Sequence, residues 1–171
     1  MAEKKLLVDE QNKLFDTKGM FYKEFASDIN QIRFFTVLIT KNAIEDLKEK
    51  NLLEQQVSEI VKNAVLHGNK CDKSKKVRVW YNSDKKMFRL IVEDEGDGFQ
   101  DLEKWNTFLS NRMDAFESGD PEKMMEYVAW RTEKSGPNDG GNSLFAAVEY
   151  WNGGIVYNNK KNKVAVARAV E

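Results

Sequence analysis

The stretch Val57-Ser58-Glu59-Ile60-Val61-Lys62-Asn63-Ala64-Val65-Leu66-His67-Gly68 decides the fold of this chain. Its apolar residues recur at helical spacing and form one stripe that can face a core. Glu59 and Asn63 are four positions apart, so their side chains stand one turn apart on the polar side. Gly68 follows the last periodic residue, where an αL cap is expected. Taken alone, the stretch predicts an amphipathic helix, and most such helices have a solvated polar face.

Two glycine-rich motifs follow this helix along the chain. Asp94-Glu95-Gly96-Asp97-Gly98-Phe99 closes the apolar run Met87–Val92, and Asp139-Gly140-Gly141-Asn142-Ser143-Leu144-Phe145 opens another helical pattern. Each motif is common by itself, because Asp-x-Gly-x-Gly is a frequent turn and Gly-Gly a frequent hinge. Their succession after a helix that carries a glutamate and an asparagine is uncommon.

In this order the three motifs resemble the N box and the two glycine boxes of the GHKL ATPase superfamily. Within it, the chain most resembles the serine/threonine protein kinases that act as anti-sigma factors. Glu59 to Gly68 has their Glu-x-x-x-Asn-Ala-x-x-His-Gly pattern, and Asp94 to Gly98 has their Asp-Glu-Gly-x-Gly pattern. The resemblance covers residues from about 21 to 170. It implies a Bergerat-type fold that binds ATP with Mg²⁺.

The composition is that of one globular domain. The chain has 171 residues, of which 41% are hydrophobic and 32% charged, and we expect a single domain over residues 1–171. The net charge of -1 does not suggest a surface for nucleic acid or a membrane, so we expect neither as partner. Cys71 is the only cysteine and there is no long apolar run, so we expect a cytoplasmic protein.

The order of the expected elements predicts an α+β fold. Hydrophobic periodicity predicts a short strand near Lys5–Val8, a strand at Met20–Phe25, one long helix running to about Lys48, a second helix at Leu53–His67, a hairpin at 77–92, two helices within 100–139, a helix at Ser143–Tyr150 and a hairpin at 155–167. This order suits a two-layer sandwich with a mixed or antiparallel sheet and helices on one face. In the resembled family, residues 100–139 form the ATP lid, which is enlarged here.

The candidate nucleotide site combines three kinds of group. Asp94 follows a strand, where its carboxylate can accept from the amino group of adenine, and in the family this aspartate sets the preference for adenine. Gly96 and Gly98 lack a Cβ and let the backbone approach the ring. The N–H groups at a helix start bind anions, so we expect the phosphates at Gly140, Gly141, Asn142 and Ser143.

The polar side of the first helix provides the chemistry. The amide oxygen of Asn63 suits magnesium, which prefers oxygen ligands and shares phosphate oxygens. Glu59 is one turn away and is placed to accept a proton from an attacking hydroxyl. In the resembled kinases this glutamate is the base, and the hydroxyl belongs to a serine or threonine of a partner protein. His67 and Lys70 have structural or solvated roles in the simplest interpretation.

The chain departs from the family pattern in two places. Ser143 stands where the second glycine box has its second glycine, and a serine hydroxyl can cap a helix or contact a phosphate. The segment 100–139 is rich in aromatic residues, so we expect it to pack as a subdomain or to present a partner surface. Its cations Arg112, Arg131 and Lys134 are candidates for the contact to the γ-phosphate, and the sequence does not choose among them.

The sequence therefore predicts an ATP-binding protein kinase of anti-sigma-factor type. It would phosphorylate an antagonist protein and bind a sigma factor or similar regulator. The alternative is a non-catalytic nucleotide-binding module whose partner docks on the enlarged lid. A histidine-kinase fragment is disfavoured, because the only histidine, His67, lies inside the N box. The oligomeric state stays open, with a homodimer among the options.

Overall fold

The protein folds around a six-stranded mixed sheet with the strand order β1-β5-β6-β4-β3-β2. The computed structural model describes residues 6–41, 43, 47–84, 86–100, 102–127 and 143–169. The strands are β1 (Leu7–Val8), β2 (Phe21–Ala26), β3 (Lys76–Ser83), β4 (Met87–Glu93), β5 (Gly154–Tyr157) and β6 (Lys163–Ala169). Strand β1 runs parallel to β5, and the other neighbouring pairs are antiparallel. Both predicted hairpins, β3–β4 and β5–β6, are thereby confirmed.

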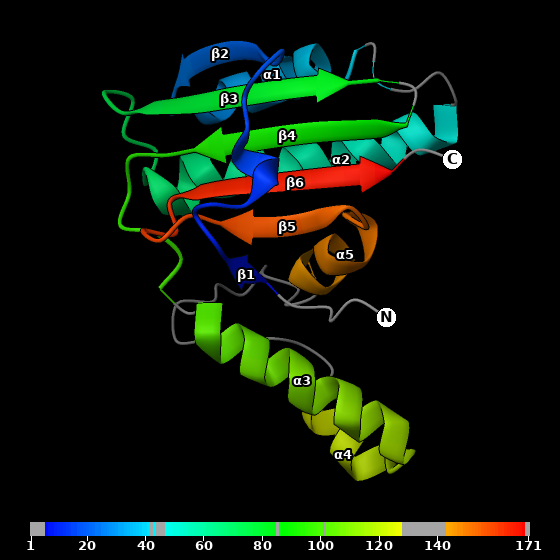
Figure 1. Ribbon diagram of the computed structural model, residues 1–171. Coiled ribbons are helices and arrows are strands. Elements are labelled where there is room, and N and C mark those ends of the chain that lie inside the picture. Colours follow the sequence, from blue (N-terminus) through cyan, green and yellow to red (C-terminus); the bar gives the residue numbers. More distant parts are fainter. Residues whose placement is uncertain are drawn as a thin grey trace.

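The helices form the second layer and a projecting arm (Figure 1). They are α1 (Ile32–Thr40), α2 (Leu47–Asn63), α3 (Leu102–Ser118), α4 (Pro121–Glu126) and α5 (Ser143–Tyr150). Helices α1 and α2 cover one face of the sheet, whereas α3 and α4 extend away from it as an arm. The predicted α+β sandwich is confirmed. None of the helices in the described ranges is long and apolar enough to cross a membrane.

The apolar stripe of α2 is the centre of the main core. Val57, Val61 and Val65 have no exposed surface, and they belong to one cluster with Val79 of β3 and Leu90 of β4. The opposite face of the sheet has a smaller core, in which Leu14, Ile91, Val156, Ala165 and Ala167 are buried together. The 3₁₀ turn at Lys13–Phe15 covers this face. Side chains that face the helices and side chains that face this turn therefore alternate along the central strands.

The predicted long helix to about Lys48 is wrong. Helix α1 ends at Thr40, and α2 begins at Leu47 instead of near Leu53. The hydroxyls of Thr36 and Thr40 donate to carbonyl oxygens one turn back, at 2.8 and 2.9 Å, which is mildly unfavourable within a helix. The apolar spacing runs on through Ala43 and Leu47, so periodicity alone does not reveal the break.

The predicted αL cap at Gly68 is also wrong. The helix continues past α2 as a π-helical segment, Ala64–Gly68, and the N–H of Asn69 donates to the carbonyl oxygen of Ala64 at 2.8 Å. The left-handed residues come later, at Lys70 with φ 53° and Cys71 with φ 58°. Gly68 is needed for a different reason, which is the close approach of a carboxylate described below.

Candidate functional site

Glu59 and Asn63 lie on α2 as the sequence predicts. Glu59 is partly buried, whereas Asn63 is exposed at the junction of α2 with the π-helical segment. Glu59 lines a hollow of about 570 Å³, whose wall also contains Ala146 of α5. Helix α5, which follows the second glycine motif, therefore borders the same hollow as the glutamate. Arg33 of α1 lines the same hollow and pairs with Glu54 at 3.4 Å.

Asp94 lies directly against the end of this helix. A Cβ built on Gly68 would be 2.2 Å from Oδ2 of Asp94, so any residue other than glycine at position 68 would displace the carboxylate. The N–H of Gly96 donates to Oδ1 of Asp94 at 2.8 Å. Burial raises the pKa of Asp94 above its ordinary value, and the bond from Gly96 only partly opposes this. The carboxylate is thus short of water and stands to gain from a hydrogen-bond donor.

The glycines after Asp94 have a packing role that the sequence did not predict. A Cβ on Gly96 would be 2.1 Å from the carbonyl oxygen of Gly68, and one on Gly98 would be 2.0 Å from that of Lys160. Gly98 also has a φ of +92°, which a residue with a side chain rarely adopts. These glycines therefore allow the Asp94 turn to pack closely against both the helix end and the β5–β6 turn. Approach of their backbone to an adenine ring stays a prediction.

Asn69 is a residue of the site that the sequence analysis missed. It has no exposed surface, and its Nδ2 donates to Oγ of Ser27 at 2.7 Å and to the carbonyl oxygen of Lys76 at 3.0 Å. Its Oδ1 accepts from the N–H of Glu95 at 2.7 Å. One side chain thus joins the helix end, the end of β2, the start of β3 and the Asp94 turn. An asparagine after Gly68 looks like a loop residue, and no sequence signal marks its burial.

A second asparagine holds the Asp94 turn from the other side. Nδ2 of Asn162, in the β5–β6 turn, donates to the carbonyl oxygen of Asp94 at 2.7 Å. The N–H of Asp94 donates in turn to the carbonyl oxygen of Asn162 at 2.9 Å. The ring of Phe99 meets the ring of Tyr157 edge-on at 5.9 Å. Burial raises the pKa of Tyr157, and the nearby charge of Asp94 adds to the effect. The phenol therefore stays neutral beside the carboxylate.

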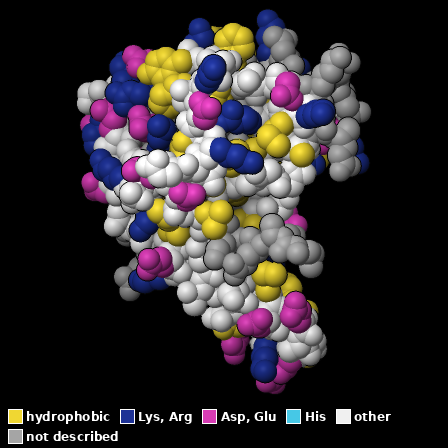
Figure 2. All heavy atoms as spheres, in the orientation of Figure 1, with side chains coloured by type: hydrophobic (Ala, Val, Ile, Leu, Met, Phe, Trp, Pro, Cys, Tyr) yellow, Lys and Arg dark blue, Asp and Glu magenta, His cyan; other side chains and the backbone are white. Residues whose placement is uncertain are grey.

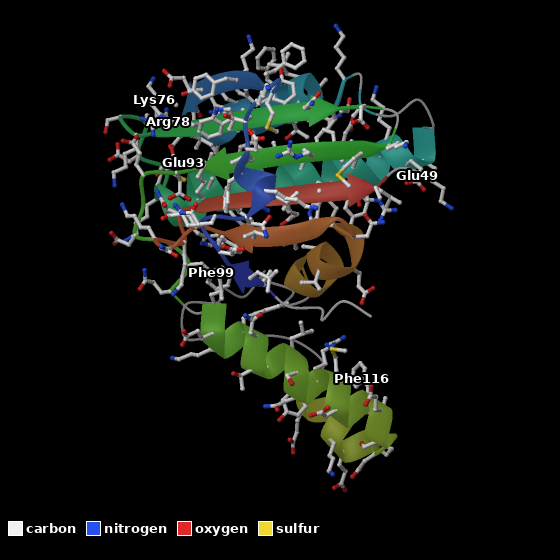
Figure 3. All side chains as sticks on the ribbon, viewed as in Figure 1. Glu49, Lys76, Arg78, Glu93, Phe99 and Phe116 are labelled. Atoms are coloured by element: carbon white, nitrogen blue, oxygen red, sulfur yellow. The ribbon has the colours of Figure 1, made fainter. Side chains whose placement is uncertain are left out.

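The labelled residues show how this end of the sheet is arranged (Figure 3). Lys76 and Glu93 lie where β3 begins and β4 ends, and Phe99 lies on the chain that leads towards the arm. The N–H of Lys76 donates to the side chain of Glu95, and Arg78 pairs with Glu93 at 3.5 Å. The backbone around Asp94 is thus fixed by side chains on several sides.

The structure places some of the predicted site residues and leaves others outside its scope. Glu59 and Asn63 lie on α2, Asp94 and Gly96 lie against Gly68 at the end of this helix, and Gly98 lies against Lys160. Gly140, Gly141 and Asn142 lie outside the described residues, as does the side chain of Ser143, which begins α5. His67 and Lys70 are exposed. The phosphate contacts therefore stay predictions.

The segment predicted as a lid is anchored at its base. Trp105 of α3 is fully buried, and the side chain of Asn106 exchanges two hydrogen bonds with the backbone of Leu6, at 2.9 and 2.8 Å. The predicted start of α4 is confirmed, since Asp120 caps it with Pro121 as first residue. Arg112 donates to the carbonyl oxygen of Tyr127 at 2.6 Å and so lies within the arm. Arg131 and Lys134 are outside the described residues.

The comparisons with known proteins agree with this geometry. A family model described as a histidine kinase-like ATPase domain matches residues 26–136, which is more than half of the chain. The match includes α2, the Asp94 turn and the arm, and it ends before Gly140. No curated protein matches the chain.

Proposed function

Because this chain belongs to the histidine kinase-like ATPase domain family, we propose that it is a serine/threonine protein kinase of anti-sigma-factor type. Membership makes it an ATP-binding, kinase-like domain of the GHKL type. In the proposal it uses Mg-ATP in the cytoplasm to phosphorylate an antagonist protein. In its other state it binds a sigma factor or a similar regulator.

The observation that carries the proposal is the contact between Gly68 and Asp94. The helix that bears Glu59 and Asn63 ends against the carboxylate that would select adenine. A buried asparagine and a π-helical segment fix that end, and π-helical segments are frequent at functional sites. The base, the metal ligand and the adenine acceptor would therefore share one rigid frame, which is what positioning of reactants requires.

The residues present fit ATP with magnesium. Asp94 is a partly buried carboxylate with a raised pKa, and an amino group of adenine would supply the donor that it lacks. Asn63 is exposed, so its amide oxygen can take one position in the shell of a magnesium ion, with phosphate and water in the others. Helix α5 borders the hollow that Glu59 lines, and its start would suit the phosphates because it follows the glycine motif.

Glu59 is the proposed catalytic base. Bound Mg-ATP would supply the phosphoryl group to be transferred. Glu59 would accept the proton of the attacking hydroxyl, and the hollow that it lines is open to a substrate segment. Arg33 and Glu54 stand on the wall of that hollow, where the hydroxyl-bearing segment of a substrate protein would have to enter.

The test is a titration followed by a transfer assay. Calorimetry with ATP in the presence and absence of Mg²⁺ should show binding that depends on the metal. Incubation with labelled ATP and candidate antagonist proteins from the same genome should then label a serine or threonine. Metal-dependent binding with no transfer to any such protein would leave the nucleotide site standing and reject the kinase.

A second candidate function is a nucleotide-binding module that works by docking. It is favoured by one observation, which is the exposed apolar residues on the α3–α4 arm: Met113, Phe116 and Met125. In this function ATP would set the state of the protein without phosphoryl transfer. Transfer that depends on Glu59 would exclude it.

A further inference from the structure

An apolar stripe on α3 runs out of the core into solvent. Leu102, Trp105 and Leu109 are at most 7% exposed, because they pack against the body of the protein. The next two positions of the same stripe are Met113 and Phe116, which are 42% and 41% exposed. The spacing of three and four residues keeps all five on one side of the helix. The stripe that attaches the arm therefore continues past the edge of the body, as the position of Phe116 shows (Figure 3).

The exposed part of the stripe is held in place. The guanidinium of Arg112 lies 4.7 Å from the centre of the Phe116 ring, and it also donates to the carbonyl oxygen of Tyr127. The ring of Tyr127 lies 5.1 Å from that of Phe108, so α4 is fixed against α3. A ring presented on a fixed arm loses little freedom when a partner covers it, which favours binding.

The segment that carries the exposed stripe is acidic. Residues 111–127 contain five acids and two bases, and one of the bases is the Arg112 that lies over Phe116. The acids are Asp114, Glu117, Asp120, Glu122 and Glu126. Glu117 is one turn from Met113 and therefore flanks the exposed stripe, whereas Asp114 lines the hollow between α3 and α4. Hydrophobic and acidic side chains lie side by side on the arm in Figure 2.

We propose that this face of the arm binds a basic amphipathic helix of a partner protein. The apolar side of that helix would cover Met113 and Phe116, and its lysines and arginines would face Glu117 and the net negative charge of the arm. Methionine adapts its shape to different apolar surfaces, which suits a docking site. The inference deepens the second candidate function, which takes the arm as its docking surface and on which it rests, but the contact itself needs no nucleotide.

The exposed stripe is short, and its small area limits the expected affinity for the partner helix. Two large apolar residues with a charged rim form a contact below the size of a stable protein interface. We expect dissociation constants on the order of micromolar, and weaker binding at high salt because the rim charges are exposed. The rest of a natural interface would come from other surfaces of the partner.

The test uses two synthetic helical peptides of about 18 residues. One has a leucine stripe with lysines on the polar side, and the other has the same stripe with glutamates. Fluorescence anisotropy should show binding of the lysine peptide to the full chain with and without Mg-ATP. The glutamate peptide should bind at least tenfold more weakly. Chemical-shift mapping should place the lysine peptide on residues 109–117.

Variants separate this face from other apolar surfaces. Phe116→Ser and Met113→Ser should each weaken the lysine peptide by about fivefold or more, and Glu117→Lys should weaken it and reduce its salt dependence. The matched control is Phe34→Ser on α1, because Phe34 is 64% exposed and far from the arm in sequence. It should change nothing. Mg-ATP binding by the same variants, measured separately, reports on the nucleotide site alone.

Several results would overturn the docking proposal. These are equal binding of the two peptides, equal loss in Phe34→Ser and Phe116→Ser, and no binding of the lysine peptide at 100 times the expected dissociation constant. Sedimentation that shows self-association abolished by Phe116→Ser would assign the face to a second copy. Shift changes confined to residues 128–142 in the peptide-free Phe116→Ser protein would assign it to the chain itself.

Discussion

Oδ1 of Asn69 accepts a hydrogen bond from the main-chain N–H of Glu95 at 2.7 Å. This bond joins the end of the helix that carries Glu59 and Asn63 to the turn that carries Asp94. Glu95 directly follows Asp94 in the sequence, and Asn69 directly follows Gly68. A shift of either segment would therefore be passed to the other.

Asn69→Ala should destabilise the protein and weaken ATP binding together. It leaves the N–H of Glu95 and the hydroxyl of Ser27 without this partner, and a buried unsatisfied group costs about 1–3 kcal/mol. Thermal unfolding and calorimetry with Mg-ATP measure the two effects. The matched control is Asn159→Ala, since Asn159 is exposed and contacts Glu10 at the surface. A destabilised Asn69→Ala that binds ATP with wild-type affinity would show that the bond does not position Asp94.

Gly68→Ala should displace the Asp94 carboxylate. The added Cβ would be 2.2 Å from Oδ2, and crowding of this kind costs about 1–3 kcal/mol. We expect loss of ATP affinity beyond what the lower stability explains. Gly19→Ala is the control, because Gly19 has a φ of +79° and no heavy atom near its Cβ. It should cost about 1–2 kcal/mol of stability and leave ATP binding unchanged.

Asp94→Asn should greatly weaken ATP binding while the fold survives. The side chain ends a strand at a turn, and the asparagine oxygen can still accept from Gly96. What is lost is the charged acceptor, worth about 1–3 kcal/mol or more against an amino donor. The measurement is ATP affinity by calorimetry, with circular dichroism as the check on folding. Wild-type affinity in this variant would remove Asp94 from the adenine site.

The same variant should reveal the raised pKa of Asp94. Burial raises this pKa in the folded state, so folding favours the protonated carboxyl. The resulting stability is fully present below the ordinary value of 3.8 and is lost as the pH rises through the raised folded pKa. The Asp94→Asn variant has no carboxyl at this position and therefore does not lose this stability as the pH rises. Its unfolding temperature relative to wild type should therefore increase from pH 3 to pH 7, and a constant difference across that range would contradict the assignment.

Sequence patterns predicted the parts of the fold that depend on local periodicity. The stripe of α2 and the alternation in β3 and β4 have their predicted positions, because burial on one face imposes a repeat on the residues. The break after Thr40 was missed, since apolar spacing continues across it. Gly68 was assigned as a cap, because a helix cap and a close packing contact both favour glycine and cannot be told apart from the sequence.

The residues of the candidate site can also be divided into those that the sequence predicted and those that it did not. Glu59, Asn63 and Asp94 were identified by their motifs, and the structure places the helix of the first two against the third. Asn69, Ser27 and Arg33 were missed, because their importance comes from neighbours that are distant along the chain. No spacing rule connects Asn69 with Glu95, which lies 26 positions further on.

Glu59 and Asn63 should separate chemistry from binding, although they are one turn apart on the same helix. Glu59→Gln keeps the shape of the side chain and removes its charge, which repels phosphates, so ATP should bind at least as well as to wild type. If Glu59 is the base, phosphoryl transfer should fall by roughly 10²–10⁴-fold. Asn63→Ala removes the proposed magnesium ligand and should weaken binding of Mg-ATP more than binding of metal-free ATP.

Glu54→Gln is the matched control for Glu59→Gln, because Glu54 lines the same hollow and pairs with Arg33. It should leave ATP affinity unchanged and reduce transfer only through the affinity for the substrate protein. Transfer at the wild-type rate by Glu59→Gln would exclude the base, whatever its place in the motif. Equal weakening by Asn63→Ala with and without Mg²⁺ would exclude the metal ligand.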